Sequence, residues 1–348
     1  MSTEITIVQP DDMHLHVRDG LALKNVIAHT AQRFGRAIIM PNLKPPVTTV
    51  AMAKAYHDRI IAALPEGSDF EPLMTLYLTD ITTPEEIKRV AESSFVHALK
   101  LYPAGATTNS DAGVTNIENV YATLEAMAEH AVPLLIHGEA LKHDNDEVVD
   151  VFDREKVFID NTLVRLTERF PDLRIVFEHI TTDDAVQFVN DASDLVAATI
   201  TPQHLMYERN EIFKGGIRPH FYCLPVLKRK RHQLSLIDAA TSGSPFFFLG
   251  TDSAPHTKSA KENACGCAGI YSAHAGIEFY AEVFEKAGAL NKLENFASKF
   301  GADFYDLPYN QKTITLRKED WIVPSTYPFN DEVVVPLLAN EAVTWKMV

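Results

Sequence analysis

Asp12-Met13-His14-Leu15-His16-Val17-Arg18-Asp19 is a short stretch near the start of the chain with apolar residues between its polar ones. In a β-strand, residues two positions apart point to the same face. His14 and His16 would therefore direct two imidazoles to one point, with Leu15 on the opposite face. Neutral imidazoles are good ligands for divalent metals. The stretch predicts a metal site at the end of a strand, and two unrelated histidines at a solvated strand end are the alternative.

Apolar runs typical of buried strands recur along the chain after this stretch. They occupy residues 36–42, 71–79, 98–103, 132–139, 174–179, 195–201 and 246–252. Helical patterns separate them, at residues 21–34, 51–64, 116–130, 153–170, 182–190, 229–241 and 274–287, with one more beginning at Pro84 after an N-cap at Thr83. Such alternation predicts a parallel sheet buried on both faces.

Eight strand–helix repeats match the size of a (β/α)8 TIM barrel in the α/β class. An open, doubly wound sheet is the structural alternative. No Gly-x-Gly-x-x-Gly turn follows a predicted strand, and polar residues stand at the ends of many strands rather than at one switch point. We therefore predict a barrel over residues 1–305. The pattern changes afterwards to short strand-like pieces at 313–316, 332–338 and 342–347, so residues 306–348 are expected to form a small C-terminal extension packed on the barrel.

Composition excludes several classes of function. The chain has 348 residues, 46% hydrophobic content and a formal net charge of −15. This acidic balance and the absence of a basic run longer than residues 228–231 argue against nucleic-acid binding. The N-terminal residues lack a basic and apolar leader pattern, and no apolar stretch has membrane-spanning length, so we expect a cytoplasmic protein without a membrane partner.

The three cysteines are Cys223, Cys265 and Cys267. An odd, small number argues against a disulfide framework. Cys265 and Cys267 could form a thiolate metal site, but their spacing is one residue short of Cys-x-x-Cys and no second pair exists.

Candidate metal ligands gather at the ends of the predicted strands. These residues are His14, His16, Asn42, Lys100, His137, His179 and Asp252. In a parallel barrel the carboxyl ends of all strands meet at one rim, where the function of such barrels is found. Four histidines and an aspartate on one rim predict a metal centre.

Lys100 is unusual because it lies inside an apolar strand, where a bare ammonium is costly to bury. A protonated lysine cannot bind a metal because it has donors and no acceptor. A lysine converted to a carbamate would be an anionic ligand able to bridge two metals. Pairing of Lys100 with a carboxylate such as Asp252 is the alternative.

This pattern of strand-end ligands resembles the amidohydrolase superfamily and, within it, the dihydroorotase family of the short, single-function bacterial type. The matching stretches are residues 10–19, 40–43, 100–104, 137–139, 177–182, 199–205, 249–256 and 265–269. The resemblance covers nearly the whole chain. One departure is a polar segment at residues 141–151 that is longer than is usual for the type.

The resemblance implies a hydrolase that acts on a cyclic amide in pyrimidine (UMP) biosynthesis. Its substrates would be N-carbamoyl-L-aspartate and L-dihydroorotate, and its cofactor two Zn²⁺ per subunit, in a homodimer. One zinc would be held by His14, His16 and Asp252 and the other by His137 and His179, with a carboxylated Lys100 as the bridge and Asp252 as the catalytic proton carrier. The implied substrate contacts are His16, Arg18, Asn42, His137, Leu224, His256 and Ala268.

Residues 104–110 are small and hydroxyl-rich, and directly follow the Lys100 strand. An ordinary connecting loop would have this composition. A mobile lid with Thr107 and Thr108 as substrate donors is the functional interpretation, which the resemblance favours.

Three other functions are alternatives to that of a dihydroorotase. A hydantoinase or dihydropyrimidinase is another cyclic amidase, but Arg18 and Asn42 favour an acidic substrate. A mononuclear deaminase would have no use for Lys100. A metal-binding barrel without catalysis belongs to a different class, and metal stoichiometry with a turnover assay distinguishes it.

Overall fold

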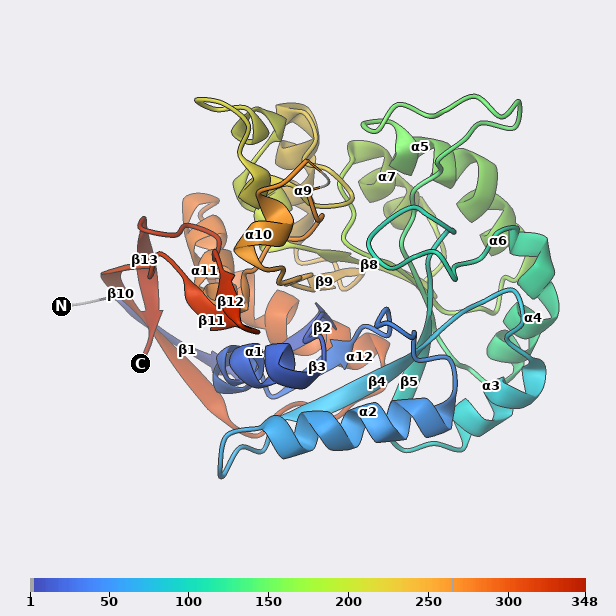
Figure 1. The fold of residues 1–348 in the computed structure, drawn as a ribbon, viewed down its shortest axis with the longest axis horizontal. Helices are drawn as coiled ribbons and strands as arrows, with labels where there is room; N and C mark the ends of the chain where they lie inside the picture. The colour runs from blue at the N-terminus through green and yellow to red at the C-terminus, as the bar shows by residue number, and fades with distance from the viewer. Residues whose placement is uncertain (1–2, 265) are drawn as a thin grey trace.

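The computed structural model describes residues 3–264 and 266–348, and a parallel barrel forms its centre (Figure 1). The 8-stranded sheet runs in sequence order from β2 to β9. Its strands are β2 (Asp11–Leu15), β3 (Arg36–Ile39), β4 (Glu71–Tyr77), β5 (Val96–Leu101), β6 (Leu134–Ile136), β7 (Ile175–Phe177), β8 (Val196–Ile200) and β9 (Phe247–Leu249).

The first and last strands of the sheet meet through the segment that follows β9. The Asp252 amide donates to the His14 carbonyl at 2.8 Å, and the His16 amide donates to the Ser253 carbonyl at 3.1 Å. These bonds close the sheet beside the predicted ligands. The prediction of a (β/α)8 barrel is confirmed, and the open doubly wound sheet is excluded.

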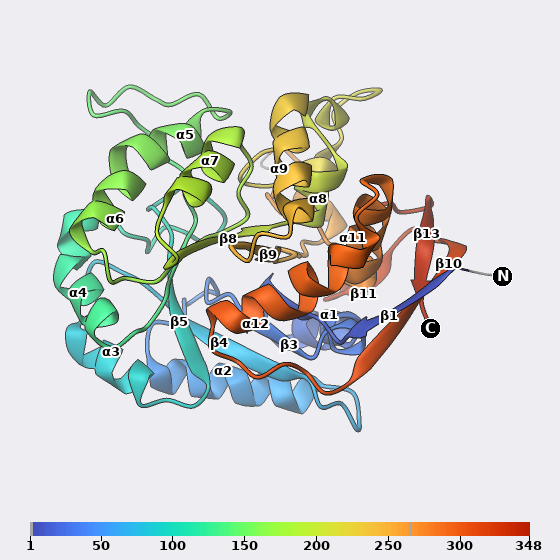
Figure 2. The same ribbon diagram turned by 180° about the vertical axis from the view of Figure 1, so that it is seen from behind.

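Helices surround the barrel in both views (Figures 1 and 2). They are α1 (Gly20–Arg33), α2 (Val50–Ala63), α3 (Pro84–Ala91), α4 (Tyr121–Glu129), α5 (Arg154–Phe158), α6 (Val164–Arg169), α7 (Asp183–Asp191), α9 (Lys230–Ser242) and α11 (Gly276–Lys286). Side-chain caps start several of them, as where Thr182 Oγ1 accepts from the Ala185 amide at 3.1 Å. The predicted helix at 153–170 is interrupted by a π-turn at Ile159–Leu163, which periodicity does not signal.

Apolar side chains fill the amino-terminal end of the barrel, whereas polar side chains gather at its carboxyl-terminal end. Met13, Ile38, Leu135 and Phe248 are among the apolar side chains of the filled end, which α12 (Phe300–Phe304) covers (Figure 2). Adding a Cβ at Gly301 would place it 2.8 Å from Met13, so glycine permits this close approach. The polar side chains are left to the opposite, carboxyl-terminal end of the strands.

A small antiparallel sheet lies beside the barrel and contains both ends of the chain. It has the order β1 (Glu4–Val8), β10 (Thr313–Ile322) and β13 (Ala342–Met347), and a hairpin of β11 (Tyr327–Phe329) and β12 (Glu332–Val334) accompanies it (Figure 1). Strand β1, which the sequence pattern did not reveal, pairs with the predicted extension. The division at 305/306 stays a prediction.

Two further short helices, α8 (Pro202–Met206) and α10 (Lys258–Lys261), lie in the segments that follow β8 and β9. Within the described ranges, no helix combines the length and apolar character that a bilayer crossing requires.

Candidate active site

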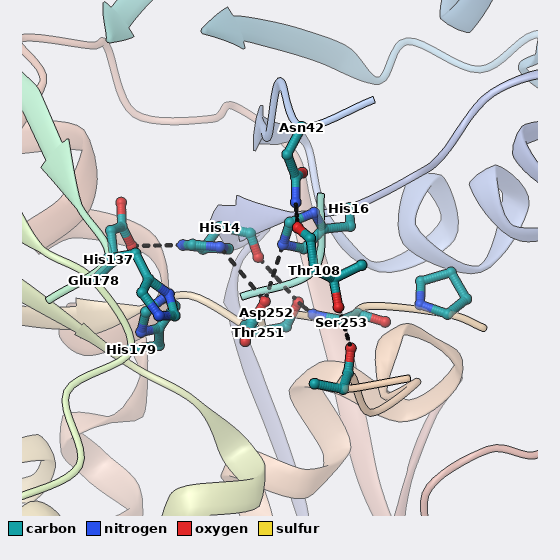
Figure 3. A network of polar contacts seen from close by, with 12 residues as sticks. His14, His16, Asn42, Thr108, His137, Glu178, His179, Thr251, Asp252 and Ser253 are labelled. Atoms are coloured by element: carbon teal, nitrogen blue, oxygen red, sulfur yellow. Dashed lines mark hydrogen bonds and ion pairs between the residues drawn. The ribbon is translucent and has the colours of Figure 1, made fainter. Parts of the chain in front are cut away.

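Two histidines and an aspartate meet where β2 and β9 end (Figure 3). His14 Nε2 lies 3.5 Å and His16 Nε2 lies 3.1 Å from Asp252 Oδ1. All three residues are buried, and one ligand atom from each lies within 4.8 Å of the others. This spacing allows the three side chains to hold one metal ion.

A second pair of histidines lies next to the first group. His137 follows β6 and His179 follows β7, and His137 Nδ1 is 3.2 Å from His179 Nε2. The ring centroid of His179 is 5.0 Å from that of His14. The two predicted ligand groups are therefore neighbours in one site.

Burial keeps the imidazoles of His14, His16 and His179 neutral. It lowers the pKa of His14, and it holds the pKa values of His16 and His179 well below the usual range of histidine. A neutral imidazole has a lone pair to offer a metal, whereas an imidazolium has none. The electrostatics of the site therefore suit metal binding.

Lys100, on β5, is fully buried, and its charge acts on His14, His16 and His179. Its Nζ has no hydrogen-bond partner in the described part of the protein. Burial lowers the pKa of Lys100 to about 8, although Glu178 and Asp252 act in the opposite direction. The alternative of an ion pair between Lys100 and Asp252 is not seen among the described residues. A lysine with this pKa has a fraction of free amine near neutral pH, as carbamate formation requires.

Glutamates that were not predicted orient two of the ligands. His14 Nδ1 lies 2.8 Å from Glu178 Oε2, and His137 Nε2 lies 2.9 Å from Glu139 Oε2. A carboxylate on one ring nitrogen fixes the tautomer and directs the other nitrogen toward a metal. Both glutamates stand within two residues of a predicted ligand, and this adjacency was the available signal.

Asp12 is a further residue that sequence reasoning did not single out. Its carboxylate accepts from the Thr251 amide at 2.8 Å, from Thr251 Oγ1 at 2.5 Å and from the His14 amide at 3.2 Å. Burial raises the pKa of Asp12 to about 7. These bonds fix the backbone on both sides of the His14–Asp252 contact.

The backbone is strained at two of the candidate ligands. His179 has a φ of 42° and Asp252 a φ of 45°, in the left-handed region that residues other than glycine rarely adopt. Strain of this kind persists where the surrounding structure fixes a functional side chain.

The sequence matches the model of the amidohydrolase family over residues 7–323. It is 61% identical over 347 residues to a dihydroorotase of Pseudomonas syringae pv. tomato, covering 100% of this chain and 99% of the relative. The chain belongs to the amidohydrolase family, among its dihydroorotases. The predicted family is confirmed.

Other relatives of this amidohydrolase agree. A dihydroorotase of Ralstonia pickettii is 60% identical over 348 residues, with 100% of each chain covered. The crystal structure of a Campylobacter jejuni dihydroorotase has a TM-score of 0.90 at 35% identity, covering 100% of this chain and 98% of that one. A Saccharomyces cerevisiae dihydroorotase in complex with 5-fluoroorotic acid has a TM-score of 0.92 at 34% identity, covering 99% and 98%.

Arg18 lines the cavity of this amidohydrolase, and His256, which is not among the lining residues, is bonded to it. Arg18 Nε donates to the Pro255 carbonyl at 3.0 Å, and Arg18 Nη2 donates to His256 Nε2 at 3.1 Å. Burial first, and then the charge of Arg18, lowers the pKa of His256 to about 2, so this imidazole is neutral. Arg18 also has a positive φ, of 59°, and Tyr56 donates to its carbonyl.

The predicted lid lies inward over the site. Asn42 Nδ2 donates to the Thr108 carbonyl at 3.1 Å, and Thr108 Oγ1 donates to the Ala268 carbonyl at 3.3 Å (Figure 3). Thr107, Thr108, Leu224 and Ala268 line one cavity of about 20 Å³ with the histidines. The structure thus brings together the metal-ligand candidates and most of the predicted substrate contacts. Tyr102, Ala254 and Gly269 also line this cavity and were not predicted.

Cys223 and Cys267, the cysteines that the structure describes, are not among the candidate metal ligands. Cys223 is buried, with its Sγ 3.9 Å from His204 Nε2, and burial raises the pKa of its thiol to about 12. Cys267 is partly buried, and Cys265 lies outside the described residues.

Proposed function

We propose that this amidohydrolase interconverts N-carbamoyl-L-aspartate and L-dihydroorotate plus water, with two Zn²⁺ ions per subunit. The observation that carries the proposal is the convergence of two adjacent groups of candidate ligands beside a partly buried arginine in one cavity. The sequence relatives with 60–61% identity over the full chain are dihydroorotases, which supports the same reaction.

The side chains present fit a pair of metal ions. His14, His16 and Asp252 would hold one, and His137 and His179 the other. The buried Nζ of Lys100 lacks a partner among the described residues, which is costly for an amine unless it is converted into a ligand. Neutral imidazoles with carboxylate oxygens are a ligand set that suits zinc. When bound, the ions would supply a water activated at neutral pH and polarise the substrate carbonyl.

Asp252 is the residue proposed to carry the proton. Its Oδ1 lies between His14 and His16 at the centre of the site, and burial raises its pKa. A carboxylate with a raised pKa can accept a proton from the attacking water and donate it to the leaving amide nitrogen. In the cyclisation direction the same transfers run in reverse.

Arg18, Asn42 and His256 are proposed to bind the substrate carboxylate. The guanidinium of Arg18 is partly buried and already bonded to His256 and to the Pro255 carbonyl, so it is fixed before the substrate arrives. A fixed arginine binds a carboxylate with charge-assisted bonds in a bidentate geometry. A hydantoinase, whose cyclic amides need carry no carboxylate, gives no reason for this arginine. The likeness to the L-hydantoinase of Arthrobacter aurescens, at 14% identity and a TM-score of 0.77, concerns the fold alone.

The loop with Thr107 and Thr108 is proposed to act as a lid. A cavity of about 20 Å³ has room for about one water molecule, and the substrate is much larger. The lid must therefore move outward for the substrate to enter, and closing again would exclude water. A homodimer and a cytoplasmic location stay proposals that rest on the resemblance to the family.

Substrate selectivity tests this function against another cyclic amidase. The enzyme should hydrolyse L-dihydroorotate and leave dihydrouracil, which lacks the carboxylate, nearly untouched. Arg18→Met should raise KM for dihydroorotate by roughly tenfold to a hundredfold with the metal content unchanged. Arg59→Met is the matched control, because Arg59 is half-exposed and pairs with Asp19. A preference for dihydrouracil, or an unchanged kcat/KM in Arg18→Met, would contradict the proposal.

A further inference from the structure

Lys261, the last residue of α10, is buried although it pairs with no carboxylate in the described part of the chain. Its side chain is 4% exposed. Nζ donates to three backbone carbonyls: Tyr222 at 2.8 Å, Cys267 at 3.0 Å and Gly269 at 2.5 Å. An ammonium has three N–H groups, so each one is used.

These three carbonyls belong to two segments that line the substrate cavity. Leu224 lies two residues after Tyr222, and Ala268 lies between Cys267 and Gly269. The Gly269 amide also donates to the Tyr222 carbonyl at 3.0 Å. Lys261 therefore joins the two segments from behind the cavity.

The contact with Cys267 decides how the next amide points. A trans peptide is planar, and its N–H points opposite to its carbonyl. Because the Cys267 carbonyl faces Lys261, the Ala268 N–H faces away from Lys261, while Ala268 itself lines the cavity. Within residues 3–264 and 266–348, no hydrogen bond from this amide is found. The Ala268 amide is thus a donor left for a ligand.

The backbone of Ala268 and Gly269 also contacts Ala254 and Thr108 closely. Gly269 has a φ of 147°, and a Cβ there would lie 2.5 Å from the Ala254 carbonyl. The Ala268 carbonyl accepts from Thr108 Oγ1 at 3.3 Å. The backbone around Ala268 therefore has little freedom to turn its amide without losing the bond to Lys261.

We propose that Lys261 is a positioning residue that holds the Cys267–Ala268 peptide with its N–H toward the cavity, where it donates to the carboxylate of the substrate. This inference rests on the proposed function. The ammonium also adds positive charge behind the carboxylate position, and the charges of Arg18 and Lys261 both act on His256. Burial lowers the pKa of Lys261 to about 8, so the group is still mainly charged at neutral pH. An apolar side chain would fill the same space at lower cost in desolvation, but it would leave three carbonyls without a donor.

Three variants of Lys261 test the proposal in the metal-loaded enzyme. Lys261→Met keeps the bulk and removes the donors, Lys261→Gln keeps two N–H donors without the charge, and Lys261→Arg keeps both charge and donors. We expect Lys261→Met to raise KM for dihydroorotate by about tenfold to a hundredfold, with a smaller change in kcat. Binding of 5-fluoroorotate, measured by calorimetry, should weaken by a similar factor. Lys261→Gln should lie between Lys261→Met and wild type, and Lys261→Arg should recover most of the binding.

Lys292→Met is the matched control. Lys292 Nζ also donates to two backbone carbonyls, Thr241 at 2.8 Å and Ser242 at 3.0 Å, but beside the end of α9, away from the cavity. The KM of Lys292→Met for dihydroorotate should equal that of wild type. Circular dichroism and metal content establish that each variant is folded and loaded.

The failures of this inference and of the proposed function are distinguishable. A wild-type protein that does not turn over dihydroorotate would refute the function. An active wild type, with folded Lys261→Met or Lys261→Gln variants of unchanged KM and unchanged affinity for 5-fluoroorotate, would refute only the role of Lys261.

Discussion

Glu178 Oε2 lies 2.8 Å from Nδ1 of His14, and both side chains are buried. The same oxygen accepts from Thr199 Oγ1 at 2.5 Å, which fixes the carboxylate in turn. The hydrogen bond places the proton of His14 on Nδ1, so the lone pair of Nε2 points toward Asp252 and the metal position. His14 is therefore oriented before a metal binds.

Glu178→Gln should weaken zinc binding because the amide that replaces the carboxylate supports the imidazole less. Loss of such a partner reduces metal affinity by about tenfold to a hundredfold. Zinc titration against a competing chelator measures the effect. Glu278→Gln is the control, since Glu278 is an equally buried carboxylate that pairs with Arg33 instead. Equal zinc affinity in Glu178→Gln and wild type would show that Glu178 does not tune the site.

Lys100→Ala should lose most activity and bind fewer than two metals, because the bridging anion is gone. Native mass spectrometry of the wild type should find the mass of one CO₂ added at Lys100, and acid treatment should release it. An unmodified Lys100 in the fully active, metal-loaded enzyme would contradict the carbamate.

The double variant Thr107→Ala and Thr108→Ala should lower kcat strongly while both metals stay bound. Thr108 Oγ1 donates to the Ala268 carbonyl at 3.3 Å, which would hold the proposed lid closed, and both threonines line the cavity. Hydrogen exchange of residues 104–110 should slow when N-carbamoyl-L-aspartate is added. A wild-type kcat, together with exchange that the substrate does not alter, would leave this segment an ordinary loop.

His29 should make stability depend on pH at the junction between α1 and the extension. Its ring packs 4.5 Å from that of Tyr327, and burial lowers its pKa from 6.5 to about 4. A group with a lowered pKa binds more protons when unfolded, so its contribution is present above pH 6.5 and is lost as the pH falls toward 4.

We therefore expect the difference in Tm between wild type and His29→Gln to shrink as the pH is lowered from about 7.5 to about 4.5. Protonation of the metal ligands affects both proteins alike, so the comparison isolates His29. A difference that stays constant over this range would rule out a titrating role for this residue.

Strand periodicity was enough to predict the barrel and the rim on which its ligands meet. The resemblance to a family then supplied the roles of His14, His16, His137, His179 and Asp252, which the structure brings together in one site. Spacing alone could not have shown that the charge of Lys100 acts on histidines of both groups, His14 and His179, because that depends on how the sheet closes.

The parts that sequence reasoning missed depend on contacts between distant segments. Strand β1 pairs with β10 more than 300 positions away, as between Ile5 and Leu316, and nothing local in either segment signals a partner. Glu178 looks like part of an apolar strand until Thr199 and His14 surround it. Lys261 has the sequence context of an exposed helix residue, and only the fold shows that backbone carbonyls enclose its ammonium.

The most direct test of the account is turnover of L-dihydroorotate by the purified protein, followed by loss of ultraviolet absorbance and by appearance of N-carbamoyl-L-aspartate. We expect hydrolysis at alkaline pH and cyclisation at acidic pH, with two zinc ions per subunit. We also expect loss of both reactions after chelation, their return when zinc is added, and no activity in Asp252→Asn. A folded protein with two bound metals that converts neither compound, or one whose turnover survives complete removal of metal, would contradict the account.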